Sequence, residues 1–403
     1  MTLVVLELER PIPTDVLEEL SAALPYASES ASNFVIDPDD PRQIRFQVAA
    51  DADIAQVKDK VARLVQDMTR GWRSVRTQVI EDLRSGKPPH AGDVWTELLE
   101  RGLVSVLGPG QVSLSGVALD LLEFFDRTFT RIGRSMGARK VRFPQMIGMD
   151  ALNRCQYFAS FPHHVTFCSH LREDVDVLAA FSRAQEKGEA FSFARGMHEP
   201  EQVGVPAACF HVYLELADSN LDAPRTVTTV ARCFRYEAEA MTTLERLWDF
   251  TMREIVFVGP EAWVKARRKK SLEAVVRLVR RLGLHGWVET ANDPFFVNTF
   301  VARKYYQLLT EAKYELRLTL PHTASSLAAA SFNYHEDFFG RAFQVRLGGE
   351  PVHTACTAFG IERWVFAFLS QYGLDPAGWP ALVRDGVAQE TDLDPGVPSD
   401  EEQ

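Results

Sequence analysis

One segment of this sequence constrains its structure and chemistry more than any other. Within residues 235–254, Arg235 and Glu237 stand two positions apart, and Arg246 follows a short loop, four residues before Phe250. A guanidinium offers forked donors that match the oxygens of a phosphate group, and an aromatic ring offers a flat face to a base. Residues of these types suit the phosphates and the base of a nucleotide.

A second segment, residues 358–363, opens a helix far along the chain and ends in Gly360-x-x-Arg363. If the fold brings the two segments together, Arg363 can reach the end of a triphosphate. Either segment alone is a weak signal, and the pair is specific. The sequence contains no Gly-x-x-x-x-Gly-Lys loop and no Gly-x-Ser-x-Gly elbow, which disfavours a P-loop nucleotide site and the usual hydrolase architecture.

Composition favours a soluble cytoplasmic enzyme. The 403 residues are 46% hydrophobic, which predicts a large core and two domains. No apolar run approaches the ~20 residues that span a bilayer, and no signal peptide is evident, so no membrane association is expected. Five cysteines in so long a chain predict thiols rather than a disulfide framework. The net charge of -11 argues against a general nucleic-acid binder.

The chain divides by pattern into four regions. Residues 1–84 read as a small α/β domain, and residues 85–92, rich in Gly and Pro, read as a linker. Residues 93–385 form the main domain. Residues 386–403 read as an acidic disordered tail, because the stretch from residue 390 onward has six acidic groups and neither Lys nor Arg.

The main domain shows long helical patterns that alternate with short β-rich runs. Residues 119–132 are predicted as an amphipathic helix, and residues 207–216, 226–235 and 247–258 as strands. The predicted fold class is therefore α+β: a largely antiparallel sheet flanked by helices, preceded by the small N-terminal α/β domain.

Residues 93–385 resemble the seryl-type class II aminoacyl-tRNA synthetases. They are still more similar to truncated relatives of these enzymes, the zinc-dependent amino acid:carrier protein ligases. The resemblance implies a cytoplasmic, homodimeric ligase that activates a small amino acid with ATP as an aminoacyl-adenylate and passes it to the phosphopantetheine thiol of an acidic carrier protein. The stretches that carry it are residues 160–163, 206–213, 235–254, 331–335 and 354–363.

The resemblance also implies the residues that bind ATP and Mg²⁺. Arg235 and Arg363 are expected to act on the triphosphate during catalysis. The nucleotide-binding set that the resemblance implies is Arg235, Glu237, Arg246, Leu247, Phe250, Ser331 and Arg363.

A zinc site is implied in the same way. The matching ligands are Cys209, Glu254 and Cys356, and the metal is expected to take the amino group of the substrate amino acid. Thiolates and a carboxylate suit zinc, and three protein ligands leave a fourth position for substrate. Ordinary roles remain open for each residue: Cys356 could simply pack, and Glu254 could pair with Arg253. Which of Gly, Ala or Ser is the substrate also stays open.

A second candidate metal cluster lies in one short loop. His163, His164, Cys168 and His170 fall within eight residues and contain only ligand-type side chains. Their spacing is not that of a zinc finger, and in the resemblance this loop lines the substrate cavity. A contact with substrate or carrier is the alternative role.

One departure from the resemblance concerns magnesium. An acidic residue is expected just before Ser331, where the chain instead has Ala328 and its alanine neighbours. Glu336 or Asp337 could substitute from nearby. Otherwise turnover is impaired, and a non-catalytic paralogue with a regulatory or scaffold role becomes the alternative.

One basic patch bears on the identity of the acceptor. Arg277, Arg280 and Arg281 lie on a predicted helix and suit an acidic partner, which can be a carrier protein or, as the alternative, tRNA. A plain solvated helix face explains them equally well. The N-terminal domain lacks the long helical arm of bacterial seryl enzymes, although archaeal ones have a compact domain, so a tRNA-charging activity stays open.

Overall fold

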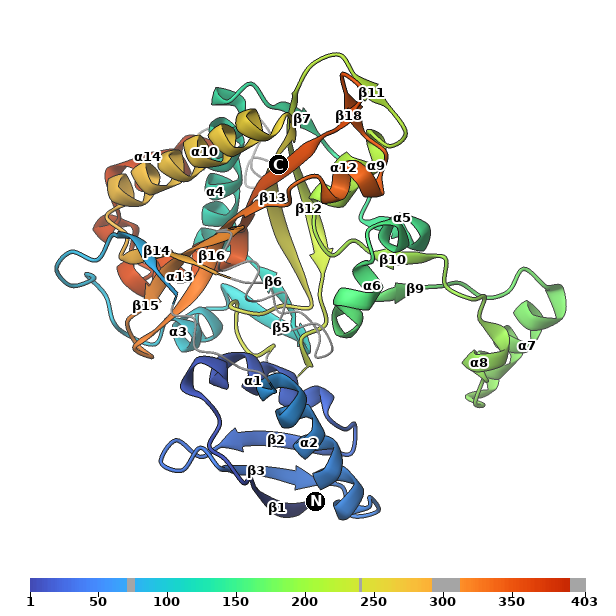
Figure 1. Ribbon diagram of the computed structural model, residues 1–403. Helices are drawn as coiled ribbons and strands as arrows, with labels where there is room; N and C mark the ends of the chain where they lie inside the picture. Colours follow the sequence, from blue (N-terminus) through green and yellow to red (C-terminus); the bar gives the residue numbers. More distant parts are fainter. Residues whose placement is uncertain (71–76, 239–240, 292–311, 392–403) are drawn as a thin grey trace, which may run out of the picture.

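The computed structural model describes residues 1–70, 77–238, 241–291 and 312–391. Residues 1–70, which we call the N-terminal unit, form a small antiparallel sheet of order β1-β3-β2 with two helices and a separate hydrophobic core (Figure 1). Asp53 caps the longer helix by accepting from the backbone N–H groups of Ala55 and Gln56. The elements are β1 (Thr2–Glu7), α1 (Leu17–Ala23), β2 (Ala31–Ile36), β3 (Gln43–Val48) and α2 (Ile54–Thr69).

The main part of the chain is built on an eight-stranded sheet of order β4-β14-β15-β16-β19-β13-β12-β7. All neighbouring pairs are antiparallel except β12 and β7, which confirms the predicted α+β architecture. The strands are β4 (Val79–Asp82), β7 (Arg139–Val141), β12 (Arg225–Phe234), β13 (Asp249–Gly259), β14 (Gly286–Thr290), β15 (Lys313–Leu320), β16 (Ser325–Tyr334) and β19 (His353–Gly360).

The sheet is covered on both faces, and the alternation along β13 shows how. Ile255 and Phe257 lie in the larger core, under the long helices, whereas Val256 and Val258 lie in a second core on the opposite face. The helices over the larger core are α3 (Val94–Glu100), α4 (Gly116–Ser135), α10 (Glu261–Leu282), α13 (Ile361–Tyr372) and α14 (Ala381–Thr391).

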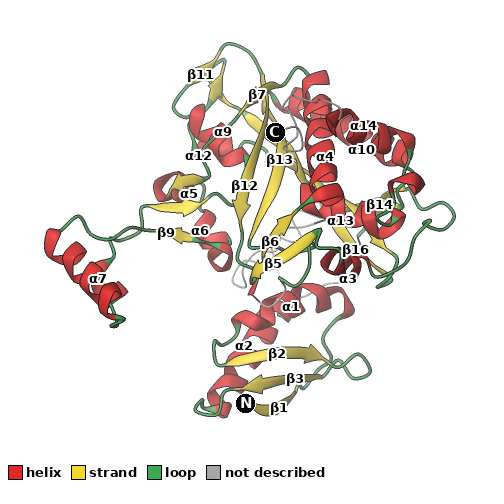
Figure 2. Cartoon of the chain, turned by 180° about the vertical axis from the view of Figure 1, so that it is seen from behind, coloured by secondary structure: helices red, strands yellow, loops and turns green. Residues whose placement is uncertain are grey.

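Further helices cover the second face, and others belong to a projecting arm. Around the second core lie α5 (Met149–Arg154), α6 (Tyr157–Ser160), α9 (Cys209–Glu215) and α12 (Phe338–Ala342). Figures 1 and 2 show α7 (Val175–Lys187) extending away from the body of the molecule on an arm that also carries α8 (Phe193–Gly196). The remaining strands are β5 (Val104–Gly108), β6 (Gln111–Leu114), β8 (Met146–Gly148), β9 (Phe167–Cys168), β10 (Gln202–Gly204), β11 (Asn220–Leu221), β17 (Arg346–Leu347) and β18 (Glu350–Pro351).

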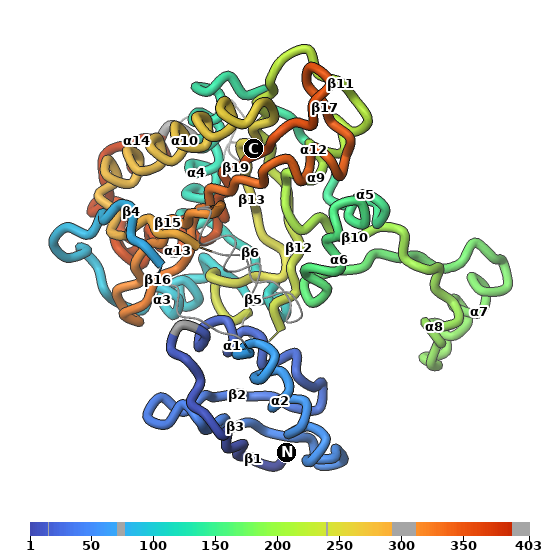
Figure 3. Tube along the Cα trace, in the orientation of Figure 1, coloured from blue at the N-terminus to red at the C-terminus, as the bar shows by residue number. Residues whose placement is uncertain are grey.

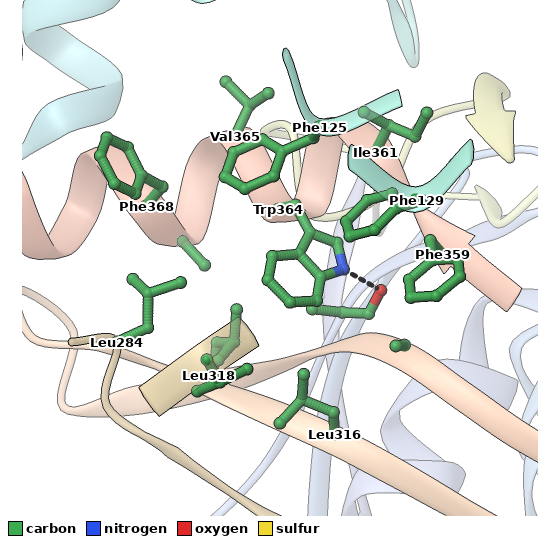
Figure 4. Close-up of a cluster of buried hydrophobic side chains, with 14 of the residues drawn as sticks. Phe125, Phe129, Leu284, Leu316, Leu318, Phe359, Ile361, Trp364, Val365 and Phe368 are labelled. Atoms are coloured by element: carbon green, nitrogen blue, oxygen red, sulfur yellow. Dashed lines mark hydrogen bonds between the residues drawn. The ribbon is translucent and has the colours of Figure 1, made fainter. Parts of the chain in front are cut away.

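The larger core is organised around Trp364 of α13, which is fully buried. Phe125 and Phe129 of α4 pack against its indole, and Phe129 stacks on Phe359 with 4.0 Å between ring centroids (Figure 4). The indole Nε1 donates to the backbone carbonyl of Ala329 at 2.9 Å, at the point where the register of β16 shifts. The helix that begins with the second segment is thereby fixed against the sheet.

One predicted element type and two predicted boundaries differ from the structure. Residues 207–216 were expected to form a strand and instead contain helix α9. Strand β4 lies in the range assigned to the N-terminal domain, residues 1–84, yet it pairs with β14 in the main sheet. Helix α14 continues to Thr391, past the predicted start of the tail at residue 386. The rest of that tail, residues 392–403, lies outside the described residues.

Figure 3 shows the two parts as a trace along the chain. No helix among the described residues combines the length and the apolar character that crossing a membrane requires.

Candidate active site

Strand register brings two of the predicted zinc ligands together. Cys356 of β19 pairs with Val256 of β13, and Ala358 pairs with Glu254, so Cys356 and Glu254 are diagonal neighbours on one face of the sheet. Cys209 is the first residue of α9, which packs over this face. The ligand atoms of the three side chains all lie within 4.8 Å of one another, and all three residues are buried. We call them the Cys-Glu-Cys cluster.

Helix α9 begins at this cluster for a physical reason. Its N-terminal N–H groups have no partner within the helix, and the preceding Ala208 offers no side-chain cap. The backbone N–H of Cys209 donates instead to Glu254 Oε1 at 3.1 Å. The carboxylate therefore orients the cysteine by capping its helix. The alternative pairing of Glu254 with Arg253 does not occur, because Arg253 points to the other face and binds Asp126 at 2.5 Å.

The electrostatics of the cluster show that it suits a cation. A hydrogen bond with Cys356, burial and the charge of Glu254 raise the pKa of Cys209 well above its usual value. The hydrogen bond with Cys209 lowers the pKa of Cys356, but burial and Glu254 outweigh it and the net shift is upward. Burial likewise raises the pKa of Glu254. Three acidic groups buried together can ionise only beside a compensating positive charge, so this donor set fits a divalent metal.

Two residues that the sequence analysis did not assign also contact the cluster. The side-chain amide of Asn333 donates to Cys356 Sγ at 3.3 Å and to Ser331 Oγ at 3.2 Å. His335 Nε2 lies 3.8 Å from the same sulfur, and its Nδ1 contacts Thr354 Oγ1 at 3.1 Å. Both residues belong to the stretch 331–335 that carried the family resemblance. The available signal for Asn333 was the alternation along β16, because Ser331 and Asn333 share a face.

The predicted phosphate-binding arginines converge around Glu237. Arg246 Nη1 donates to Glu237 Oε2 at 2.7 Å. Although burial raises the pKa of Glu237, the charges of Arg246, Arg363 and Arg235 lower it, with a net downward shift. The charges of three guanidiniums thus act on one carboxylate, which Arg246 contacts directly, and we call Arg235, Arg246 and Arg363 the arginine cluster.

Backbone carbonyls orient the members of the arginine cluster. Arg235 Nε donates to the carbonyl of Pro206 at 2.9 Å. Arg363 Nε donates to the carbonyl of Glu245 at 2.7 Å, and its Nη1 to that of Ala328 at 3.1 Å. Each guanidinium keeps further N–H groups for other acceptors, because it carries five donors in all. Guanidinium donors of this kind suit the oxygens of a polyphosphate.

Phe250, the predicted base contact, and Leu247, another predicted nucleotide-binding residue, differ in exposure. Phe250 is partly buried, and the Arg235 guanidinium lies 5.6 Å from its ring centroid. Leu247 is only 5% exposed and belongs to the larger hydrophobic core. Leu247 therefore supports the site by packing, while Phe250 retains accessible surface.

The carboxylates near the expected magnesium position differ in where they lie relative to Arg363. Asp337 lies beyond β16 and pairs with Arg341 at 2.6 Å, and Glu336 follows β16 at the end opposite Ala328, whose carbonyl binds Arg363. Glu315 of β15 instead pairs directly with Ser331 in the sheet. Burial lowers the pKa of Arg363, and the charges of Glu237 and Glu315 oppose that shift only in part. Of these three carboxylates, Glu315 lies beside the arginine cluster.

The alternative metal cluster is not formed. Within the described residues, the one group of three or more potential ligands that converges is Cys209, Glu254 and Cys356. His164 is buried in a stack with Phe161, and His170 stacks on His198. Burial lowers the pKa of His163 to about 4 and of His164 to about 3, so both rings are neutral near pH 7. Local density of ligand-type residues was misleading here.

The predicted docking arginines lie on α10, across the sheet from the Cys-Glu-Cys cluster. Arg277 and Arg281 line a groove of about 530 Å³ between α4, α10 and α14, together with Arg131 of α4. Arg280 is paired with Glu81 of β4 at 2.9 Å. The structure thus brings two of the three residues to one groove and directs the third to the sheet edge.

Comparison with known proteins gives three kinds of match. Residues 206–372 match the tRNA synthetase class II core domain (G, H, P, S and T). The chain is 32% identical over 328 residues to the amino acid–[acyl-carrier-protein] ligase 2 of Bradyrhizobium diazoefficiens, covering 80% of this chain and 95% of that relative. It is 25% identical over 389 residues to a type-2 serine–tRNA ligase of Methanothermobacter thermautotrophicus, covering 91% of this chain and 74% of the relative.

Solved structures show the same fold. The crystal structure of A. aeolicus tRNASec in complex with M. kandleri SerRS matches 98% of this chain and 79% of that chain, with a TM-score of 0.72 at 24% sequence identity. A seryl-tRNA synthetase of Pyrococcus horikoshii complexed with ATP matches 75% of this chain and 64% of that chain, with a TM-score of 0.54 at 16% identity.

Proposed function

This chain belongs to the amino acid–[acyl-carrier-protein] ligases, and we propose that it uses ATP to activate a small amino acid and then transfers it to the phosphopantetheine thiol of a carrier protein. One observation carries the proposal: Glu254 and Cys356 of the Cys-Glu-Cys cluster lie on the central sheet, and Glu254 belongs to the segment that holds Arg235 and Arg246 of the arginine cluster. Glu254 ends the segment that Arg235 begins. An amino acid held at one cluster therefore has its carboxylate near the other.

The Cys-Glu-Cys cluster would hold zinc. Cys209, Glu254 and Cys356 are the three ligands, and Asn333 donates to the sulfur of Cys356. Zinc, when bound, supplies a Lewis acid with an open position for the amino group of the substrate. The buried walls around the cluster exclude bulk water, which strengthens the polar contacts made there.

The arginine cluster would act in the first half-reaction. The amino acid carboxylate attacks the α-phosphorus of ATP, a new carboxyl–phosphate bond forms, and the bond to the β-phosphate breaks to release pyrophosphate. Arg235 neutralises charge that builds on the α-phosphate, and Arg363 binds the far end of the triphosphate. No general base is required, because the nucleophile is already ionised. Catalysis then rests on positioning and charge neutralisation.

Magnesium would accompany ATP beside the arginine cluster. Ser331 offers a hydroxyl, and Glu315 offers the carboxylate that the sequence analysis expected near Ala328. Glu315 Oε1 is paired with Lys313 at 2.9 Å, and its second oxygen is the one that would accept a metal. Oxygen donors of this kind suit Mg²⁺, which keeps most of its ligands as water and phosphate oxygens.

A mass-shift assay tests the acceptor. ATP, the small amino acids and the protein should produce an aminoacylated carrier only when the carrier is in its holo form, because the thioester requires the pantetheine thiol. Apo-carrier is the control. Loading of unfractionated tRNA without labelling of any holo-carrier would refute the ligase assignment.

One specific observation favours the tRNA-charging alternative. The type-2 serine–tRNA ligase match covers 91% of this chain, which leaves fewer residues unmatched than the N-terminal unit contains. Part of that unit is therefore shared with tRNA-charging relatives. The same assay distinguishes the two acceptors.

We propose that α10 docks the acidic carrier. Exchanging Arg277 and Arg281 for glutamate should slow carrier loading and leave ATP–pyrophosphate exchange unchanged, because α10 lies across the sheet from the Cys-Glu-Cys cluster. The loading rate should fall as salt rises, since exposed charges are screened beyond about 8–10 Å.

Lys58→Glu with Lys60→Glu on α2 is the matched control, because it changes net charge equally at another site. A carrier docked at α10 must pass its arm around the sheet. Unchanged loading in the α10 variant would reject Arg277 and Arg281 as the docking surface.

A further inference from the structure

The N-terminal unit reaches the candidate active site through the side chain of Tyr26. Its hydroxyl donates a 2.8 Å hydrogen bond to the backbone carbonyl of Tyr236, a residue 210 positions further along the chain. Its ring meets His163 edge-on, with 5.2 Å between centroids. Figure 1 shows the unit lying against the main part beneath the β5–β6 hairpin.

Tyr236 lies directly between Arg235 and Glu237 in the chain, so its backbone affects how both side chains are placed. Its N–H donates to the carbonyl of His164 at 3.2 Å, while its carbonyl accepts from Tyr26. The N–H of Tyr236 is therefore bonded to the main part of the chain, and its carbonyl is bonded to the N-terminal unit. Their bonds set the orientation of the peptide units that carry Arg235 and Glu237.

The main part of the chain contacts the Tyr236 side chain through Trp248. The Trp248 ring meets that of Tyr236 at 5.0 Å, and its Nε1 donates to Thr166 Oγ1 at 2.8 Å. Its backbone N–H donates to the carbonyl of Gly110 at 2.9 Å, at the tip of the β5–β6 hairpin. Gly110 has a φ of +64°, and a Cβ there would lie 2.6 Å from Trp248 N, so only glycine allows this approach.

The surroundings of Tyr26 keep its hydroxyl a donor. Burial, then the charge of Glu237, raises the pKa of Tyr26, and these effects exceed the opposing effect of Arg246. The same two charges that form the ion pair beside the nucleotide site therefore act on Tyr26. This is consistent with a side chain at the wall of that site.

We propose that Tyr26 is a positioning residue for ATP, contributed by the N-terminal unit. By holding the carbonyl of Tyr236, it keeps Arg235 and Glu237 in the geometry that receives the triphosphate. The inference rests on the proposed nucleotide site, and it gives the N-terminal unit a role in the reaction. Linkage makes the effect reciprocal: whatever docking of Tyr26 adds to ATP affinity, bound ATP adds to docking.

Tyr26→Phe tests this most directly, since it removes one hydroxyl and keeps the ring contact with His163. Calorimetric titration with Mg·ATP should show about 2- to 10-fold weaker binding, the range expected for one lost hydrogen bond. In pyrophosphate exchange, the KM for ATP should rise by the same factor, with a smaller change in kcat.

Tyr372→Phe is the matched control. The Tyr372 hydroxyl donates to the backbone carbonyl of Leu282 at 2.7 Å, which is the same interaction at a place remote from the nucleotide site. This variant should lose comparable thermal stability and bind Mg·ATP as the wild type does. A purely structural role for Tyr26 predicts the same behaviour in both variants.

Hydrogen exchange supplies a second readout. Saturating Mg·ATP should slow amide exchange in residues 14–26 of the wild-type protein, and less so in Tyr26→Phe. Equal ATP affinity in wild type and Tyr26→Phe would overturn the inference. Weaker ATP binding in Tyr26→Phe, in a protein that loads no carrier, would leave the inference standing and reject the ligase function instead.

Discussion

Replacing Cys209 with alanine should remove zinc from the protein and lower amino-acid-dependent pyrophosphate exchange by more than about 100-fold. Loss of a residue that merely supports a metal ligand costs 10- to 100-fold, so loss of a ligand should cost more. The cluster offers three ligands within 4.8 Å, and two are too few to retain the metal in a catalytic site. Metal analysis of purified protein gives the measurement.

Cys233→Ala is the control for this experiment. Cys233 of β12 is fully buried in the same hydrophobic core, but it is not a member of the Cys-Glu-Cys cluster. The control should therefore keep stoichiometric zinc and its exchange activity while losing some stability. Full zinc content in Cys209→Ala would show that the metal binds elsewhere.

Arg235→Ala should reduce pyrophosphate exchange by about 10²- to 10³-fold, the usual effect of removing one donor that stabilises transition-state charge. Zinc content should not change, because Arg235 bonds to Pro206 and not to the Cys-Glu-Cys cluster. The measurement is exchange rate at saturating amino acid, with metal analysis on the same preparation.

Arg235→Lys refines this prediction. Lysine keeps the positive charge and loses the forked donors, so its rate should fall between those of wild type and Arg235→Ala. Exchange near the wild-type rate in Arg235→Ala would reject the assignment of residues 235–254 as the segment that binds the α-phosphate.

The family resemblance predicted the sheet architecture and the three members of the Cys-Glu-Cys cluster. Spacing along the sequence did not, because Glu254 and Cys356 are neighbours only through the register of β13 and β19. The loop with His163, His164, Cys168 and His170 shows the converse. The rings of His163 and His164 lie 4.0 Å apart, but His170 stacks on His198, so closeness in sequence did not bring the four ligand-type residues to one point.

Helix α9 shows why one element was predicted wrongly. Its residues Cys209, Phe210, His211, Val212 and Tyr213 are all buried. A short segment buried on every side has no apolar periodicity, so a helix and a strand look alike in sequence. The contact of Tyr26 with Tyr236 could not be predicted either, since it joins separate units and leaves no local pattern.

The pairing of β4 with β14 has a consequence for how the chain is made. The N–H of Gln78 bonds to Thr290 Oγ1 across 212 positions of sequence, so the edge strand leaves the ribosome long before its partner. At about 5–20 residues per second, that interval lasts about 10–40 seconds. During synthesis the N-terminal unit can form its own core, while β4 stays unpaired because β14 has not yet been made. The first strand of the central sheet to be synthesised can join it only after β14 has emerged.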